Sequence, residues 1–250
     1  MSIGLAKKSY STAPWADQLT LGGPGCGRRT SARKPSAQRS WSAGVSDPMR
    51  IFQNMYYPNV IYHVYNHSVA HEQVFRETAD YHYFLRKIRS ELLPYADLLA
   101  YCLMPTHFHF MLIPKPVGTE PFKTVEGESR QQRLHAIFRS LLSSYTRVVN
   151  KSFNRRGSLF RAKTKYHPAY SEFIPKDEEL EEDVPFTRYI PYIKKCFDYI
   201  HANPVAAGLT RAATDWPYSS AQDYAGIRAG TLCNYALAER LIGVRRGEME

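Results

Sequence analysis

The sequence predicts an α+β domain in which an antiparallel sheet carries helices on one face. The predicted elements follow the order strand, helix, two strands, helix, strand. The composition of the 250 residues is ordinary for a globular protein, with 44% hydrophobic and 22% charged residues. Apolar runs are only a few residues long, against the roughly 20 that a membrane-spanning helix needs, so we expect no membrane partner.

The first half of the domain is predicted to hold three strands and one helix. Residues 60–67 alternate and are rich in β-branched and aromatic side chains, which is typical of a strand. Residues 80–93 repeat apolar side chains at helical spacing. Residues 97–104 and 107–114 predict two strands joined by a short turn, and a Gly- and Pro-containing loop follows over residues 114–129.

The second half supplies a long helix, a strand and a final helix. Residues 130–151 carry one apolar stripe at helical spacing, and residues 166–173 predict a strand. A final helix over residues 191–202 is predicted to end before Pro204, because the residue before a proline disfavours helical geometry. The resulting order is that of the ferredoxin-like or RNA-recognition-like topology.

The chain is predicted to divide into a disordered basic extension over residues 1–54, a domain over residues 55–224 and a tail over residues 225–250. The extension is either a basic arm that helps to hold nucleic acid or upstream sequence that is not translated, with initiation at Met49 or Met55. The net charge of +10 favours polyanionic partners. The acidic loop 175–185 is expected to shield or repel rather than to bind metal.

Cysteine usage favours a reducing compartment. The four cysteines stand far apart, without the pairs typical of zinc sites or disulfide frameworks. No basic segment followed by an apolar stretch opens the chain, so no secretory signal is visible. We therefore expect a cytoplasmic protein with free thiols.

The sharpest local feature is the pair His107 and His109 at the start of a predicted strand. Alternate side chains of a strand share a face, so both imidazoles point the same way, roughly 6.6 Å apart along the backbone. Such a pair can share one divalent cation. The alternative is two histidines on a partly solvated sheet face.

Tyr145 and an unbroken basic stretch are the other candidate features. Tyr145 lies on the apolar stripe of its helix, so it is either a core tyrosine or a nucleophile. Residues 130–165 contain ten Lys and Arg and no acidic residue, which points to phosphate contacts or to a surface that serves only solubility. The predicted nucleic-acid-binding residues are Arg139, Arg147, Lys151, Arg155, Arg156, Arg161, Lys163 and Lys165.

Together these parts suit cleavage of a nucleic-acid strand by tyrosine attack. A metal on the histidines would stabilise charge on the phosphate, and Tyr145 would attack the phosphorus to leave a phosphotyrosine and a free 3′-hydroxyl. A free tyrosine has a pKa of about 10, so a neighbouring cation must help to remove its proton.

The sequence resembles the single-tyrosine HUH transposases, and among them the REP-associated tyrosine transposases of prokaryotes. The resemblance covers about residues 55–224. Six segments carry it: YHVYNH at 62–67, YCLMPTHFH at 101–109, YTRVVN at 145–150, NRRGSLF at 154–160, YIHANPVAAGL at 199–209 and WPYSS at 216–220.

The resemblance implies a Mg²⁺ or Mn²⁺ ion on His107 and His109, with Tyr145 as the nucleophile. It implies single-stranded DNA with an imperfect hairpin as the substrate, strand transfer without ATP, and a covalent intermediate that an incoming 3′-hydroxyl resolves. The implied protein is DNA-associated and is a monomer or a homodimer.

One residue departs from the pattern of insertion-sequence members, whose third metal ligand is a Gln four positions after the tyrosine. Here that position is Val149, which cannot ligate. Asn150 is rotated by about 140° from Tyr145. It is predicted as a third ligand if the helix ends or distorts there, and otherwise as a cap. His63 is a weaker candidate.

Two other readings stay open. One is a domesticated protein that binds hairpin DNA without cutting it, and the other is an RNA-binding module of similar topology, which would depend on 2′-hydroxyl groups. Salt weakens binding in every case, so only metal-dependent covalent chemistry identifies the enzyme.

Overall fold

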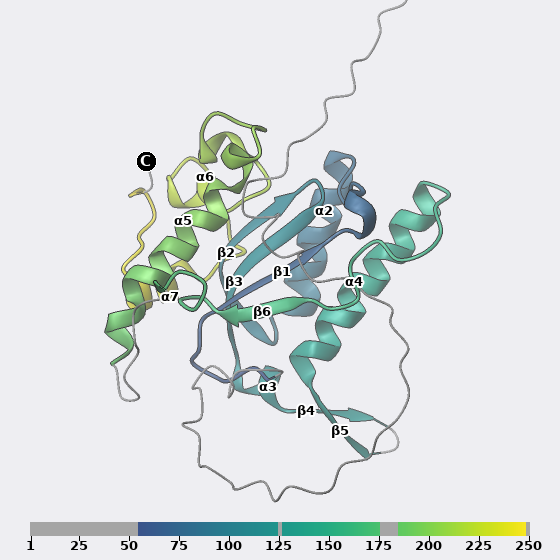
Figure 1. The fold of residues 1–250 in the computed structure, drawn as a ribbon, viewed down its shortest axis with the longest axis horizontal. Coiled ribbons are helices and arrows are strands. Elements are labelled where there is room, and N and C mark those ends of the chain that lie inside the picture. The colour runs from purple at the N-terminus through teal and green to yellow at the C-terminus, as the bar shows by residue number, and fades with distance from the viewer. Residues whose placement is uncertain (1–54, 125–126, 176–184, 249–250) are drawn as a thin grey trace, which may run out of the picture. The chain divides into compact units, whose positions relative to one another are not determined.

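The protein is seen here in a computed structural model that describes residues 55–124, 127–175 and 185–248. The expected N-terminal extension and most of the acidic loop lie outside these residues. The core is a four-stranded antiparallel sheet in the order β2-β3-β1-β6, which confirms the predicted fold class (Figure 1). Its strands are β1 (Tyr62–His67), β2 (Ala96–Met104), β3 (His107–Pro114) and β6 (Lys165–Pro168).

The register of the two central strands decides which side chains share a face. In the antiparallel pair β1 and β3, His67 lies opposite His107 and Tyr65 lies opposite His109. Directly opposed residues of a pair point to the same side of the sheet. The histidines of both strands therefore gather on one face. Phe108 and the other even-numbered residues of β3 point to the opposite face.

Two helices and a π-helical turn cover the second of these faces. They are α2 (Thr78–Lys87), the turn Ile88–Leu92 and α4 (Arg133–Ser152). Their apolar stripes bury Phe84, Leu141 and Tyr145 in one hydrophobic cluster with Phe108 and Phe110 of β3. The two helices of the predicted β-α-β-β-α-β core thus lie on a single face.

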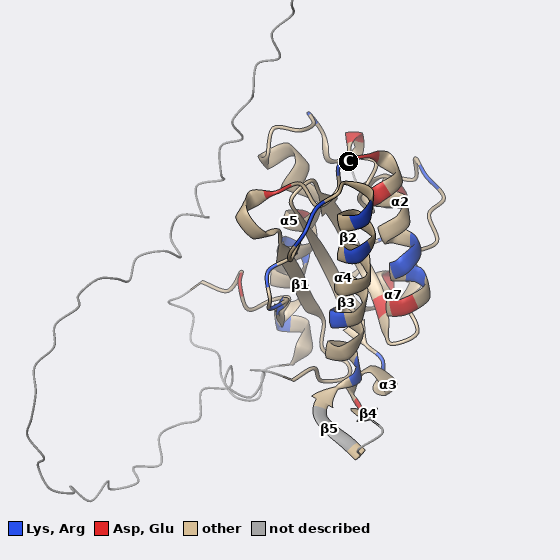
Figure 2. Cartoon of the chain, turned by 90° about the vertical axis from the view of Figure 1, so that its right-hand side faces the viewer, with Lys and Arg blue, Asp and Glu red and all other residues tan. Residues whose placement is uncertain are grey.

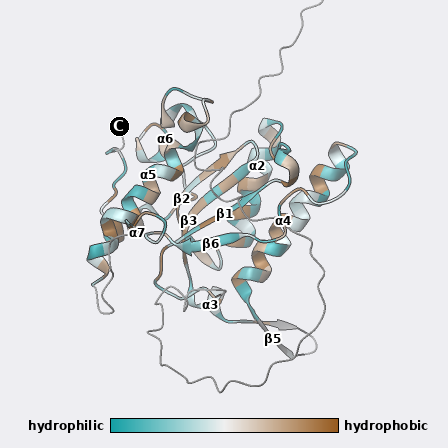
Figure 3. Cartoon of the chain, viewed as in Figure 1, coloured by the Kyte–Doolittle hydropathy of each residue, from teal (hydrophilic) through white to brown (hydrophobic). Residues whose placement is uncertain are grey.

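The histidine face is covered in part by α5 (Ile190–Ala206), with α7 (Tyr235–Ile242) beside it (Figure 1). Ile193 and Phe197 of α5 pack with Met104 and Met111 of the sheet in a second cluster. Both faces of β2 and β3 are consequently buried along nearly their whole length. Figure 3 shows brown, hydrophobic residues along β2 and β3.

Helix α5 continues beyond the predicted end. The prediction that it stops before Pro204 is wrong, since Pro204 lies inside the helix, which ends at Ala206. Proline removes the donor to the carbonyl four residues earlier and crowds that carbonyl with its ring, but the helix runs only two residues beyond Pro204. The last turn is held by Asn203, whose side chain donates to the Tyr199 carbonyl at 2.7 Å and whose carbonyl accepts from Ala207.

The connection predicted as a loop over residues 114–129 contains further structure. It holds the short helix α3 (Pro116–Thr119) and a two-stranded sheet of β4 (Pro121–Thr124) and β5 (Gly127–Gln132). The strand predicted over residues 166–173 is shorter than expected, because β6 ends at Pro168 and residues 169–173 turn away. None of the described helices is long and apolar enough to cross a membrane.

Residues 225–248, predicted as part of a tail, pack on the domain through a buried carboxylate. Asp223 is 1% exposed and accepts from Arg228 at 2.6 Å and from the Tyr235 hydroxyl at 2.9 Å. Arg228 also donates to the carbonyl of Ser219. The C-terminal segment with α7 is therefore tied to the core.

Asp223→Asn is expected to destabilise the domain by about 3 kcal/mol, because it leaves Arg228 without its counter-charge in a partly buried position. Urea denaturation measures this. The matched control is Glu239→Gln, whose pair with Arg245 is exposed and should change the free energy of unfolding by less than about 0.5 kcal/mol. Equal effects of the two substitutions would contradict the anchoring role of Asp223.

Candidate functional site

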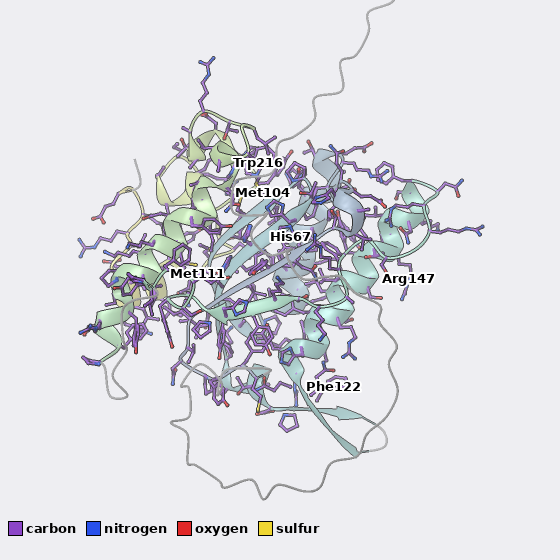
Figure 4. The ribbon with its side chains drawn as sticks, in the orientation of Figure 1. His67, Met104, Met111, Phe122, Arg147 and Trp216 are labelled. Atoms are coloured by element: carbon purple, nitrogen blue, oxygen red, sulfur yellow. The ribbon has the colours of Figure 1, made fainter. Side chains whose placement is uncertain are left out.

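Four imidazoles from β1 and β3 form the polar centre of the histidine face. The rings of His67 and His107 stack with centroids 4.6 Å apart, and those of His63 and His109 stack at 5.1 Å. The two stacks adjoin, since the His107 and His109 centroids are 5.0 Å apart. The predicted histidine pair is thus on one face, as strand alternation requires. Figure 4 labels His67 in this part of the sheet.

Burial keeps the imidazoles of His67, His107 and His109 neutral. It lowers the pKa of His107 to about 3 and that of His67 to about 4, with neighbouring charges acting in the same direction. Burial also lowers the pKa of His109 well below its ordinary value. A neutral imidazole has one unprotonated nitrogen, which is the form that ligates metals.

The same shifts predict acid destabilisation. His67 and His107 are neutral when folded but protonate near pH 6.5 when unfolded, so the stability present above pH 6.5 is lost as the pH falls toward 3–4. At pH 5 the expected loss is roughly 2 kcal/mol for each of them. Urea denaturation with a chelator at pH 7 and pH 5 measures it. Stability that stays constant over this range would contradict neutral burial.

The ring of His109 has an open position. Its Nδ1 lies 2.9 Å from Nε2 of His63, whereas its buried Nε2 has no hydrogen-bond partner among the residues that the structure describes. A buried nitrogen without a partner is unfavourable unless something else fills the site. A divalent cation fits this requirement.

The cation would need a ligand other than His, Cys, Asp or Glu for a third position, because no group of three such residues within the described ranges could hold a metal. Asn203 of α5 supplies an amide. It is 8% exposed, and its side chain hydrogen-bonds His107. The donor set His107, His109 and Asn203 therefore has the oxygen and imidazole chemistry that Mg²⁺ or Mn²⁺ accepts.

Tyr145 is not brought together with the histidines. It is fully buried on the opposite face of the sheet, in the cluster formed with α2. Its hydroxyl donates to the Val74 carbonyl at 3.0 Å, and its ring packs against Phe84 with centroids 4.9 Å apart. The arrangement is that of a core tyrosine, the alternative that its place on the apolar stripe had left open.

Asn150 also lies away from the histidines, at the end of α4. Its side chain donates to the Gly157 carbonyl at 2.8 Å and accepts from Arg155 at 2.7 Å. Both ends of the amide are thus used to hold the turn that follows the helix. This is the capping role, and the alternative role as a metal ligand has no support in the geometry.

A tyrosine that does reach the histidine face is Tyr199 of α5. Its ring lies edge-on to His109 at 5.6 Å and to His63 at 5.9 Å between centroids. Burial, and next the charge of Glu172, raise the pKa of its hydroxyl, and a hydrogen bond with Asn203 opposes them. Tyr199 is partly exposed, in contrast to Tyr145.

Sequence reasoning missed Tyr199 and Asn203, although a signal was present. The relevant spacing is a tyrosine followed four positions later by an amide, on one face of a helix. After Tyr145 that position holds Val149, and after Tyr199 it holds Asn203. The predicted helix ended before Pro204 and left Asn203 outside it, so the prediction did not place Tyr199 and Asn203 on one helix face.

Tyr65 is a second tyrosine on the same face. Its ring centroid is 5.7 Å from that of His109, and its hydroxyl donates to Glu172 at 3.5 Å. Burial, and next the carboxylate of Glu172, raise the pKa of this phenol. A hydroxyl directed at a carboxylate is a poor source of phenolate.

The basic residues predicted to bind nucleic acid lie mostly along α4 and the segment after it. Figure 2 shows Lys and Arg in blue spaced along α4. A groove of about 950 Å³ lies between α4 and residues 157–166, on the side of the sheet away from the histidine cluster, and Arg139, Arg161 and Lys163 line it. None of the described residues that line it is acidic.

The other predicted basic residues lie outside this groove. Arg147, Lys151 and Arg156 are exposed (Figure 4 labels Arg147). Arg155 is held by Glu72 at 2.6 Å, which gives it a structural role. Lys165 stands on the histidine face, over the ring of Tyr65 at 5.8 Å.

Comparisons with known proteins add a structural likeness. Neither a family model nor a curated protein matches the sequence. Among solved structures, the chain is similar to a REP-associated tyrosine transposase bound to a REP hairpin, with 15% identity and a TM-score of 0.44. The match covers 74% of this chain and 94% of the other.

Proposed function

We propose that the protein cleaves and rejoins single-stranded DNA at hairpin-associated sites through a covalent phosphotyrosine, with Tyr199 as the nucleophile and Mg²⁺ or Mn²⁺ as the cofactor. The observation that carries the proposal is the position of Tyr199 beside His109, whose buried Nε2 has no partner among the described residues. Asn203 lies one helical turn further along α5 and contacts His107.

Each residue has a separate task. His107, His109 and Asn203 would hold the cation, which when bound neutralises charge on a non-bridging phosphate oxygen. The Tyr199 oxygen attacks phosphorus, the bond to the 3′-oxygen breaks, and a phosphotyrosine and a free 3′-hydroxyl result. An incoming 3′-hydroxyl reverses these bond changes and releases the tyrosine.

Tyr199 is preferred to the two other tyrosines on geometric grounds. Tyr145 lies on the opposite face of the sheet from the histidines, and its hydroxyl donates to a buried carbonyl. Tyr65 directs its hydroxyl at Glu172. Tyr199 instead lies edge-on to His63 and His109, and its hydrogen bond with Asn203 opposes the rise in pKa that burial and next Glu172 cause.

The groove beside α4 is the proposed contact for a part of the DNA that is not being cut. Its three cations can contact phosphates, and the partly exposed Tyr166 lies at its wall with Tyr56 stacked on it at 4.3 Å. Basic and aromatic side chains together are typical of single-strand binding. The groove and the histidine cluster are on opposite faces, so one DNA molecule would have to pass around the sheet edge.

Substituting Arg139, Arg161 and Lys163 by Ala is expected to weaken DNA binding and to flatten its dependence on salt. Each lost phosphate contact should reduce the slope of log affinity against log salt by about 0.7 for a single strand. Fluorescence anisotropy at several salt concentrations measures the slope. Arg240→Ala, on exposed α7, is the matched control; a triple variant with the control's slope would contradict the assignment.

The test of the function uses labelled single strands from the DNA that flanks the protein's own gene. They are incubated with Mn²⁺ or Mg²⁺, and the products are run on a denaturing gel. Label that migrates with the protein only when the metal is present supports the proposal. Tight, specific hairpin binding without such a species would instead identify a binding protein, a reading favoured by the burial that raises the pKa of Tyr199.

A further inference from the structure

A chain of hydrogen bonds runs from the edge of the histidine cluster to the open nitrogen of His109. Glu172 Oε2 lies 2.6 Å from Nδ1 of His63, and Nε2 of His63 lies 2.9 Å from Nδ1 of His109. His63 is 2% exposed and His109 is 1% exposed, whereas the Glu172 side chain reaches solvent with 33% of its surface. The chain ends at the His109 Nε2 that has no described partner.

The carboxylate at one end of this chain and the proposed cation at the other fix the direction of its bonds. An ionised carboxylate can only accept, so Nδ1 of His63 must donate to Glu172. A cation on Nε2 of His109 leaves Nδ1 as the N–H of that ring, so Nε2 of His63 must accept from it. His109 must then donate from Nδ1, and its Nε2 holds a lone pair without a proton.

The surroundings of Glu172 keep it ionised. Burial alone would raise the pKa of this carboxyl, but the hydrogen bonds that it accepts from His63 and Tyr65 oppose burial, and the pKa lies below its usual value. The Tyr65 hydroxyl donates to the other carboxylate oxygen. Both oxygens of Glu172 therefore act as acceptors.

His107 has a hydroxyl rather than a carboxylate-linked imidazole at its Nδ1. Its Nδ1 lies 2.9 Å from the Thr106 hydroxyl. A hydroxyl can donate or accept, so it is compatible with either tautomer of the ring. The two histidines of the site thus differ, because only His109 has its tautomer set by a charged group.

We propose that Glu172 and His63 are positioning residues that hold His109 in the tautomer with a free Nε2 and thereby strengthen divalent-cation binding at His107, His109 and Asn203. The inference rests on the proposed metal site. A hydrogen bond from a carboxylate through the far nitrogen of a ligand typically changes metal affinity by 10–100-fold.

The first test needs no metal. Nitrogen-15 NMR of the metal-free protein at neutral pH reports which imidazole nitrogens carry protons. We expect an unprotonated Nε2 and a protonated Nδ1 in His109 of the wild type. In Glu172→Ala we expect a mixture of tautomers, since nothing then fixes the direction of the chain. A protonated Nε2 in the wild type would overturn the inference.

The second test measures Mn²⁺ affinity by isothermal titration calorimetry. Glu172→Ala should bind roughly 10–100-fold more weakly than the wild type. Glu172→Gln should fall between them, because its amide oxygen can still accept from His63 while its NH₂ group permits the reverse direction. Glu239→Gln, at an exposed position on α7, is the control and should leave the affinity unchanged.

The outcomes separate this inference from the proposed function. Mn²⁺ affinity equal to wild type in Glu172→Ala, in a protein that still forms the covalent adduct, would overturn the positioning role and leave the function standing. A wild type that binds no Mn²⁺ would overturn both. Since Glu172→Ala leaves the buried Nδ1 of His63 without its acceptor, we expect it to lower the melting temperature of the metal-free protein, and Mn²⁺ affinity is measured well below the melting temperature of the variant.

Discussion

Tyr199→Phe is expected to abolish the covalent protein–DNA adduct while changing DNA affinity by less than about twofold. The substitution removes one oxygen atom, which is the proposed nucleophile, and keeps the ring that packs edge-on against His63 and His109. A denaturing gel with labelled single-stranded DNA and Mn²⁺ measures the adduct, and fluorescence anisotropy measures the affinity.

Two matched substitutions serve as controls for Tyr199→Phe. Tyr65→Phe should still form the adduct. Tyr145→Phe should form it too but should lose about 1–2 kcal/mol of stability, because the buried Val74 carbonyl loses its donor. For a domain of this size that loss lowers the melting temperature by about 2–4 °C per kcal/mol. An adduct that persists in Tyr199→Phe and vanishes in Tyr145→Phe would reinstate the prediction made from the sequence.

His107→Ala and His109→Ala are each expected to reduce Mn²⁺ affinity by more than roughly 100-fold. Substitution of a residue that only hydrogen-bonds a metal ligand typically costs up to about that factor, and these two residues are the proposed ligands themselves. Each removes a neutral imidazole that burial has kept in its ligating form. Adduct formation should fall with metal occupancy, and DNA binding through the groove should remain. Titration calorimetry and the gel assay measure the two effects.

The control for the histidine substitutions is His82→Ala. His82 is exposed on α2, which packs on the other face of the sheet. It should alter neither Mn²⁺ affinity nor adduct formation. Unchanged Mn²⁺ affinity in both His107→Ala and His109→Ala would contradict the proposal that these histidines bind the metal.

The sheet and the histidine pair were predictable because both follow from local patterns. Alternation in 107–114 sends His107 and His109 to one face whatever the tertiary structure. The order of strands and helices then indicated an antiparallel α+β fold. The covering of the histidine face by α5 was not predicted, since α5 follows the last strand and lies outside the β-α-β-β-α-β order.

The sequence did not indicate that Tyr199, rather than Tyr145, lies beside the histidines, for two physical reasons. The first is that an apolar stripe on α4 does not say where Tyr145 will point; the cluster with α2 buries it away from the histidines. The second is Pro204, which disfavours but does not forbid a helix, here where the hydrogen bonds of Asn203 support the last turn. The charge run 130–165 did predict a basic surface, but the face it occupies is set by the packing of α4.

The measurement that tests the central claim most directly is mass spectrometry of the covalent adduct. Wild-type protein is trapped on labelled single-stranded DNA with Mn²⁺, digested with nuclease and protease, and searched for the peptide that carries the nucleotide. The account predicts the modification on Tyr199. Modification of Tyr145 or Tyr65 would contradict the assignment of the active face to α5 and its tyrosine.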